Sequence, residues 1–396
     1  MFRSAIFALS FAASAAAAED LDLSPILTQG LATAEASLTA DDPGTQFALG
    51  GVHFLRAIER SLQLRYDHGA SFEDFEVPVL RLPIPPNPNA APFYPGLITQ
   101  IFRHIDEDMG ASRAALVNAD TDFGVTVDLM TIWFDINSNG TQDEGEHLMD
   151  VAANALTGAR GIGVRDAAPA SLIVRFDTAD ADWLRAYTHL LSGFANLLLA
   201  FDPTEVIAEI AVSTQTMEQL RGDPSPRPLF MSPDDERFTD MFAMVCGAIN
   251  RQPDAKHTRL ARDHWLKMIA ENQSFWGRVS LETDNQDEWL PNRNQISALG
   301  IEVPPDTGDR WLEVLNDARA VLEGELLVGH WRTSPAAGVN VAKLMENPVP
   351  VDIVSWFQGH GLLSVIERGE LIDDTNWNNF ERMFFGAALM FVFWLN

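Results

Sequence analysis

Large apolar residues recur at three- and four-residue steps along most of the chain, and this spacing places them on one face of an α-helix. The clearest example lies between residues 45 and 67, where six such residues follow the pattern: Phe47, Val52, Leu55, Ile58, Leu62 and Tyr66. Similar patterns predict further helices at 25–38, 96–117, 179–201, 204–220, 233–250, 254–274, 309–323, 351–367 and 376–395. We therefore predict a mainly α, multi-helix globular protein.

Two short segments instead show the pattern of a β-strand. Residues 125–134 (VTVDLMTIWF) place Val125, Val127 and Leu129 on one face, and residues 170–176 (ASLIVRF) form a second apolar run of strand length. We expect the two segments to pair and to form a small sheet. The expected fold thus gains a minor β element, next to the polar loop that follows residue 134.

Proline marks two breaks in the helical pattern. It recurs through residues 78–95, where it removes backbone donors and excludes a helix, so we expect an ordered arm or a hinge there. The polar segment 221–228 (RGDPSPRP) is the best candidate for a linker. It divides the chain into an N-terminal α-rich region, 19–220, and a C-terminal helical region, 229–396. One continuous domain is the alternative.

The first 18 residues have the pattern of a secretory signal peptide. Arg3 precedes an apolar run, and Ala16 and Ala18 have the small-x-small spacing of a cleavage site. We expect the mature chain to begin near Glu19 and the protein to be periplasmic or secreted, whereas an apolar N-terminal helix is the alternative. The single cysteine, Cys246, lies in an apolar stretch and is predicted to be buried.

Acidic residues outnumber basic ones by 56 to 27, which gives a net charge of −29. Such a surface repels phosphate, so we exclude nucleic acid as a partner. Once the leader is removed, no apolar run reaches the length of a membrane span, so no transmembrane segment is expected. The apolar stretch 384–395 is interpreted as a last core helix, and a tail that touches a membrane is the alternative.

Residues 135–146 (DINSNGTQDEGE) carry the sharpest chemical pattern in the chain. Oxygen-bearing side chains stand at positions 1, 3, 5, 9 and 12 of this stretch, and Gly140 stands sixth, where a tight loop must turn sharply. Ca²⁺ is a hard cation that prefers six to eight oxygen ligands, so a loop around it must present oxygen at nearly every second residue. An acidic surface turn is the simpler interpretation, because Asn, Gly and Asp also favour turns.

The stretch resembles the calcium-binding loop of the EF-hand, and the resemblance covers these twelve residues only. It implies one Ca²⁺ held by six residues: Asp135, Asn137, Asn139, Thr141 through its backbone carbonyl, Asp143 directly or through water, and Glu146 through both oxygens. Gln142 departs from the usual apolar eighth position, a strand-like segment precedes the loop, and the sequence holds no second matching loop. The resemblance therefore implies a lone structural site of modest affinity.

The sequence thus predicts an exported, soluble calcium-binding protein, and it names neither a protein partner nor a polymer substrate. The alternative is an envelope or secreted hydrolase that acts on carbohydrate or another polymer, because nine of the ten tryptophans follow residue 180 and aromatic rings can stack on sugars. Its pocket would lie in the C-terminal half, near His330, Trp331, Trp356 and His360. Packing and helix capping are the simpler roles for these residues, and no catalytic residue is assigned.

Overall fold

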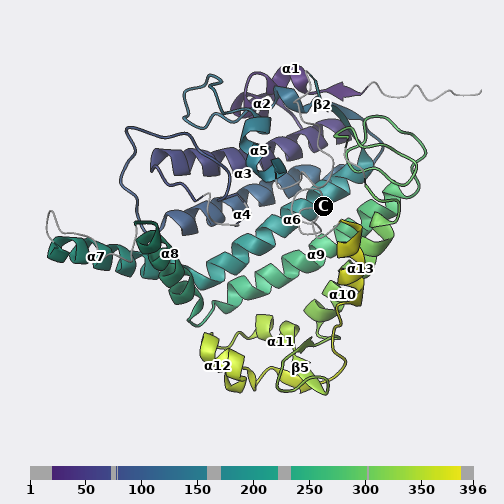
Figure 1. Cartoon of the computed structure of the whole chain (residues 1–396). Helices are drawn as coiled ribbons and strands as arrows, with labels where there is room; N and C mark the ends of the chain where they lie inside the picture. Colours follow the sequence, from purple (N-terminus) through teal and green to yellow (C-terminus); the bar gives the residue numbers. More distant parts are fainter. Residues whose placement is uncertain are drawn as a thin grey trace, which may run out of the picture.

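Four long helices lie side by side in one layer and form the body of the protein, in the order α3 (Pro43–Asp67), α4 (Leu97–Ala115), α6 (Thr178–Phe201) and α9 (Ala255–Val279) (Figure 1). The computed structural model describes residues 20–72, 77, 79–157, 171–221, 233–300 and 303–384. The prediction of a mainly α protein with a minor β part is confirmed. The predicted leader and the apolar stretch after residue 384 lie outside the described residues.

Side-chain caps fix where the long helices begin. Asp42 accepts a hydrogen bond from the backbone N–H of Thr45 at 3.0 Å, and the Thr45 hydroxyl accepts one from the N–H of Asp42 at 3.1 Å. Asp177 and Asp180 make the same reciprocal pair at the start of α6. Asp177 is therefore the cap of α6, and Asp180 lies inside the first turn of the helix.

The apolar faces of the helices meet in a core that continues past residues 222–232. Trp183 and Leu184 of α6 and Ile269 and Phe275 of α9 belong to one cluster of buried side chains. The predicted linker itself lies mostly outside the described residues. The division into regions 19–220 and 229–396 stays a prediction, while α6 and α9 join both regions in one core.

The predicted β segments form a three-stranded sheet at one end of the helical layer. β2 (Val125–Asp128) pairs with β3 (Ile173–Phe176), as predicted, and the two strands run antiparallel. β1 (Leu21–Asp22) adds to the other edge of β2 in parallel. β2 is shorter than predicted, because the side chain of Asp128 accepts the N–H of Met130 and starts the 3₁₀ turn η2 (Leu129–Thr131).

The segment predicted as one helix at 25–38 is two, α1 (Ser24–Leu27) and α2 (Leu31–Ser37). Gly30 separates them with φ of +90°, which an α-helix does not allow. The proline-rich arm is irregular where it is described, as predicted. Arg65 of α3 holds it by donating to the carbonyl oxygens of Ala70 and Val79 at 3.2 Å each.

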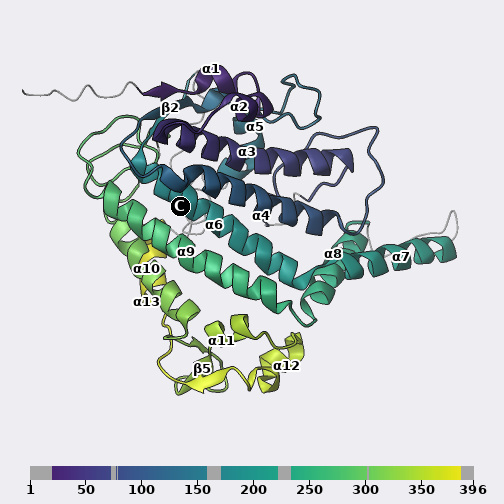
Figure 2. The same cartoon turned by 180° about the vertical axis from the view of Figure 1, so that it is seen from behind.

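Helix α7 (Thr204–Arg221) projects from the end of the helical layer in both views, and α8 (Pro233–Ile249) lies at its base (Figures 1 and 2). Cys246 of α8, which the sequence predicted to be buried, is half-buried. Within the described part of the chain, no single helix is long and apolar enough to span a membrane, whereas α6 and α7 taken together pass by length and composition but bend by 58°.

The last third of the chain packs α10 (Thr307–Glu323) against α13 (Thr375–Met383) and adds a small unit below them. This unit holds α11 (Val341–Glu346), α12 (Ile353–Gln358), η4 (His360–Leu362) and an antiparallel sheet of β4 (Val328–Gly329), β5 (Ala337–Val339) and β6 (Ile366–Arg368). The helix predicted at 351–367 is therefore wrong beyond Gln358. Gly359, at φ of +105°, ends the helix and lets the chain turn toward β6.

Candidate functional site

The segment 135–146 is a closed loop whose two ends lie side by side. The backbone N–H of Phe134 donates to the carbonyl oxygen of Glu146 at 2.8 Å, and that of Leu148 donates to Ile132 at 3.0 Å. Helix α5 (Leu148–Thr157) follows at once. The loop therefore joins the sheet to α5 through a short ladder, and its twelve residues have to fold within that closure.

Helix α3 holds the first residue of the loop from both sides of its backbone. The carboxylate of Glu59 accepts the N–H of Asp135 at 2.8 Å, and the amide of Gln63 donates to the carbonyl oxygen of Asp135 at 2.8 Å. Glu59 is 1% exposed and forms an ion pair with Arg56. Burial raises the pKa of Glu59, while the charge of Arg56 opposes the rise.

Sequence reasoning missed Glu59 and Gln63. A usable indication was present, because Glu59 stands seven residues after Val52 and three before Leu62, on the face of the helix that the apolar pattern assigns to the core. An acid at such a position is almost never left without a partner when it is buried. Its partner lies 76 residues away, so only the folded chain reveals it.

Asp135 bends the first half of the loop. Its two carboxylate oxygens accept the backbone N–H groups of Asn139 and Gly140, each at 2.9 Å. Ser138 and Gly140 take positive φ angles of 57° and 75°. Gly140, at the sixth position, therefore adopts the positive φ angle that glycine takes easily, as the sequence pattern implied.

Three of the predicted residues converge on one point. The side-chain amide nitrogens of Asn137 and Asn139 both donate to Oδ2 of Asp143 at 2.7 Å. Their amide oxygens accept the backbone N–H groups of Asn139, at 3.0 Å, and of Thr141, at 2.7 Å. Positions 3, 5 and 9 therefore face a shared centre, and Thr141 lies beside it on the exposed side of the loop.

Glu146 closes the loop from inside and is 1% exposed. One carboxylate oxygen accepts the N–H of Ile136 and the other accepts the N–H of Asp143, both at 2.8 Å. Burial raises the pKa of Glu146, and these backbone hydrogen bonds act in the opposite direction. The side chain thus connects the second, ninth and twelfth positions of the loop.

The donor chemistry of the loop suits a hard cation, although its carboxylates are not gathered into one cluster. Among the residues that the structure describes, no group of three or more His, Cys, Asp or Glu side chains stands ready to hold a metal ion. Asp135 and Glu146 point at backbone N–H groups, but a carboxylate oxygen that accepts one hydrogen bond keeps a further lone pair. An ion beside Asp143 would require Asn137 and Asn139 to turn their amide oxygens toward it.

The anchor of the loop on α3 gives a direct prediction. Replacing Gln63 with alanine should lower the free energy of unfolding by about 1 kcal/mol, because the carbonyl oxygen of Asp135 loses its side-chain donor. Gln46→Ala on the same helix is the control, since Gln46 makes only a 3.4 Å hydrogen bond to Ala40. Urea unfolding measures both. Equal losses in the two variants would show that the anchor contributes nothing specific.

Three of the four residues of the alternative hydrolase pocket, His330, Trp331 and Trp356, bond backbone carbonyl oxygens near them. His330 contacts the carbonyl oxygen of Trp356 at 3.2 Å, and the indole N–H of Trp331 donates to that of Phe357 at 2.8 Å. Trp331 is 60% exposed, and its ring lies 5.7 Å from that of Phe357. His360 is exposed and contacts the amide oxygen of Gln358. The hydrolase stays a prediction.

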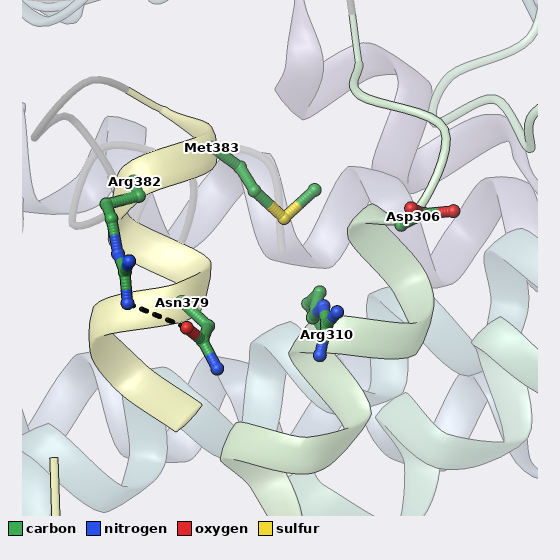
Figure 3. A pocket seen from close by; sticks show the side chains of 5 residues that line it. All are labelled: Asp306, Arg310, Asn379, Arg382 and Met383. Carbon is green, nitrogen blue, oxygen red and sulfur yellow. Dashed lines mark hydrogen bonds between the residues drawn. The ribbon is translucent and has the colours of Figure 1, made fainter. Parts of the chain in front are cut away.

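A hollow of about 310 Å³ does occur in the C-terminal half, between α10 and α13 (Figure 3). Asp306, Arg310, Asn379, Arg382 and Met383 line it, and none of them belongs to the predicted set. Arg382 donates to the amide oxygen of Asn379 at 2.8 Å. The lining holds neither a nucleophile with an adjacent base nor a pair of carboxylates, so it offers no recognisable catalytic arrangement.

A polar network crosses the helical layer. Nδ1 of His189 on α6 lies 2.8 Å from Nδ1 of His264 on α9, and Asp106 of α4 stands 4.0 Å from the other ring nitrogen of His264. Asn196 donates to Asp106 at 3.0 Å and lies 2.8 Å from the ring of His257. His257 and His264 lie seven residues apart on α9, and both rings contact side chains of α6.

No family model, no curated protein and no solved structure matches this chain. Function therefore has to be inferred from the geometry of the loop and its surroundings.

Proposed function

We propose that residues 135–146 bind one Ca²⁺ and that the ion has a structural role in an exported protein. The observation that carries the proposal is the convergence of Asn137, Asn139 and Asp143 within 2.7 Å contacts inside a loop that Asp135 and Glu146 hold closed. The spacing of these residues resembles that of an EF-hand loop. The ligands would be the six residues that the resemblance implies, with Thr141 contributing its backbone carbonyl.

The surroundings of the loop support a structural role. It joins the β2–β3 sheet to α5, and α3 contacts its first residue through Glu59 and Gln63. An ion at its centre would replace amide hydrogens as the partners of Asp143 and would connect both halves of the loop. Because Ca²⁺ binds the folded loop and not the unfolded chain, it stabilises the folded state by about 2.7 kcal/mol at a hundred times Kd.

The proposed location is the periplasm or the outside of the cell, and its support is the leader pattern in residues 1–18. Loops in extracellular modules bind Ca²⁺ at about 10⁻⁴–10⁻³ M. The implied ligands include three carboxylates (Asp135, Asp143 and Glu146) and two neutral amides (Asn137 and Asn139), which suits that range. Calcium outside the cell would then keep the site filled without high affinity.

Thermal unfolding in 5 mM CaCl₂ and in EGTA tests the site. We expect the melting temperature of the wild-type protein to be several degrees higher with Ca²⁺ than with EGTA, and we expect MgCl₂ to give a smaller rise. Asp143→Asn and Glu146→Gln should remove most of the difference between the two conditions. Glu144→Gln is the matched control, because it removes one charge from an exposed position of the same loop.

The comparison is made within each variant, so a variant that is less stable in both buffers remains informative. Identical melting temperatures of the wild-type protein with Ca²⁺ and with EGTA would refute a structural ion. If Glu144→Gln and Asp143→Asn reduced the difference in melting temperature between Ca²⁺ and EGTA equally, calcium would act through the overall negative charge and not through a specific site.

A further inference from the structure

Helix α8 carries a stripe of apolar side chains that faces solvent. Phe238, Phe242, Val245 and Ile249 follow each other at steps of four, three and four residues, and their exposed fractions are 62%, 60%, 43% and 37%. This spacing keeps all four on one narrow face of the helix. Such a continuous exposed apolar face marks a contact surface more often than a chance feature.

The opposite face of α8 is already used. Gly247 approaches Val206 of α7 so closely that an added Cβ would lie 2.8 Å from it, and Asp240 accepts a hydrogen bond from Thr214 at 3.3 Å. Gly247 and Asp240 both stand about 180–200° around the helix from Phe238. The stripe therefore points away from α7, at the end of the helical layer where α7 and α8 lie (Figures 1 and 2).

The stripe is complementary to itself. If a second α8 lies antiparallel to the first about a twofold axis between positions 243 and 244, Phe238 meets Ile249 of the other copy and Phe242 meets Val245. Each aromatic residue then faces an aliphatic one, and the four positions pair without a remainder. Twofold interfaces require this property, because each surface has to fit its own copy.

We propose that the exposed face of α8 is the contact surface for a second copy of this chain. The stripe spans only about 16 Å, since eleven residues rise 1.5 Å each, so the dimer is weak and concentration-dependent. The net charge of −29 on each copy opposes association, so added salt strengthens it.

Sedimentation equilibrium of the full-length protein tests the dimer. We expect reversible dimers that become stronger between 50 and 500 mM NaCl, and we expect Phe242→Asp to weaken association at least tenfold. Phe357→Asp is the matched control, because Phe357 is 72% exposed on α12, far from the stripe in sequence. Circular dichroism verifies that both variants keep their helix content.

Cysteine cross-linking tests the register. In a Cys246→Ser background, a mixture of the single variants Phe238→Cys and Ile249→Cys should form a disulfide-linked dimer under mild oxidation. Each variant alone should form little, because like positions lie far apart in the antiparallel pair. A dimer that links position 238 to position 238 would overturn the antiparallel arrangement.

Three outcomes overturn the proposal as a whole. The protein would stay monomeric up to several hundred micromolar at high salt, or Phe242→Asp and Phe357→Asp would weaken association equally. In the third, the monomer would bind vesicles of phosphatidylcholine through the stripe, with binding lost in Phe242→Asp, which would assign the surface to lipid.

Discussion

Gly193→Val should lower the free energy of unfolding by about 3 kcal/mol, the upper end of the usual cost of overpacking a core. Gly193 lies in the middle of α6, where that helix packs against α9. A Cβ at this position would stand 2.2 Å from Nε1 and 2.4 Å from Cδ1 of Trp265. The indole ring is rigid and also contacts Phe194, so α6 and α9 would have to separate to accept the new side chain.

Alanine substitutions at two glycines should change the free energy of unfolding in opposite directions. Gly51 lies inside α3 and has no atom within 4 Å of an added Cβ. Gly51→Ala should therefore stabilise the protein by about 0.5–1 kcal/mol, the usual gain when alanine replaces glycine in a helix. Gly193→Ala should destabilise it, because the contact with Trp265 outweighs that gain.

Guanidinium unfolding of the three variants, followed by circular dichroism, measures these changes. Gly193→Val is also expected to expose Trp265 or to perturb its fluorescence before the global transition. A Gly193→Ala variant that is as stabilised as Gly51→Ala would show that α6 and α9 do not approach as closely as described.

Acid should destabilise the protein through the histidine pair between α6 and α9. Burial lowers the pKa of His189 to about 3 and that of His264 to about 4, and the positive charges of Arg113 and Lys267 add to both shifts. Asp106 and Asp263 act in the opposite direction on His264. The two rings bond through Nδ1 atoms 2.8 Å apart, so a proton on both nitrogens would break that bond.

The direction of the pH dependence follows from these values. The unfolded chain takes up protons on both histidines near pH 6.5, whereas the folded protein does so only near pH 4 and pH 3. Above about pH 6.5 the histidines cost the folded state nothing. As the pH falls below that value, each ring lowers the free energy of unfolding by up to about 1.4 kcal/mol per pH unit, and the loss levels off below about pH 3. Between pH 7 and pH 4.5 the pair should cost at least about 3 kcal/mol.

Buried carboxylates act in the opposite sense over part of this range. The pKa of Glu282 is raised to about 7, mainly by burial, so its contribution to stability is present at low pH and is lost as the pH rises through that value. The histidine effect is therefore read from the difference between the wild-type protein and the double variant His189→Gln, His264→Gln. The same pH slope in both proteins would rule out the pair as the source.

The local elements were largely predictable, and their partners were not. Capping and apolar spacing located α3, α4, α6 and α9 to within a few residues, because these preferences act within one or two turns of the chain. The prediction failed at 351–367, where Gly359 ends the helix and the chain pairs with β5 instead. The predicted helix at 233–250 does form, but its Phe238 and Phe242 face solvent, because nothing in the described part of the chain covers that side of α8.

By itself, the sequence determined the chemistry of the loop at 135–146: which oxygen atoms it offers, at which spacing, and where glycine lets it turn. Only the tertiary structure decided three contacts between distant residues. Glu59 and Gln63 bond the backbone of Asp135, the ring of His189 contacts that of His264, and Trp265 packs against Gly193. The physical reason is the distance along the chain over which each kind of interaction acts. Backbone preferences and side-chain spacing act over a few residues, whereas these contacts join positions 72 to 76 residues apart, whose meeting depends on how every helix packs.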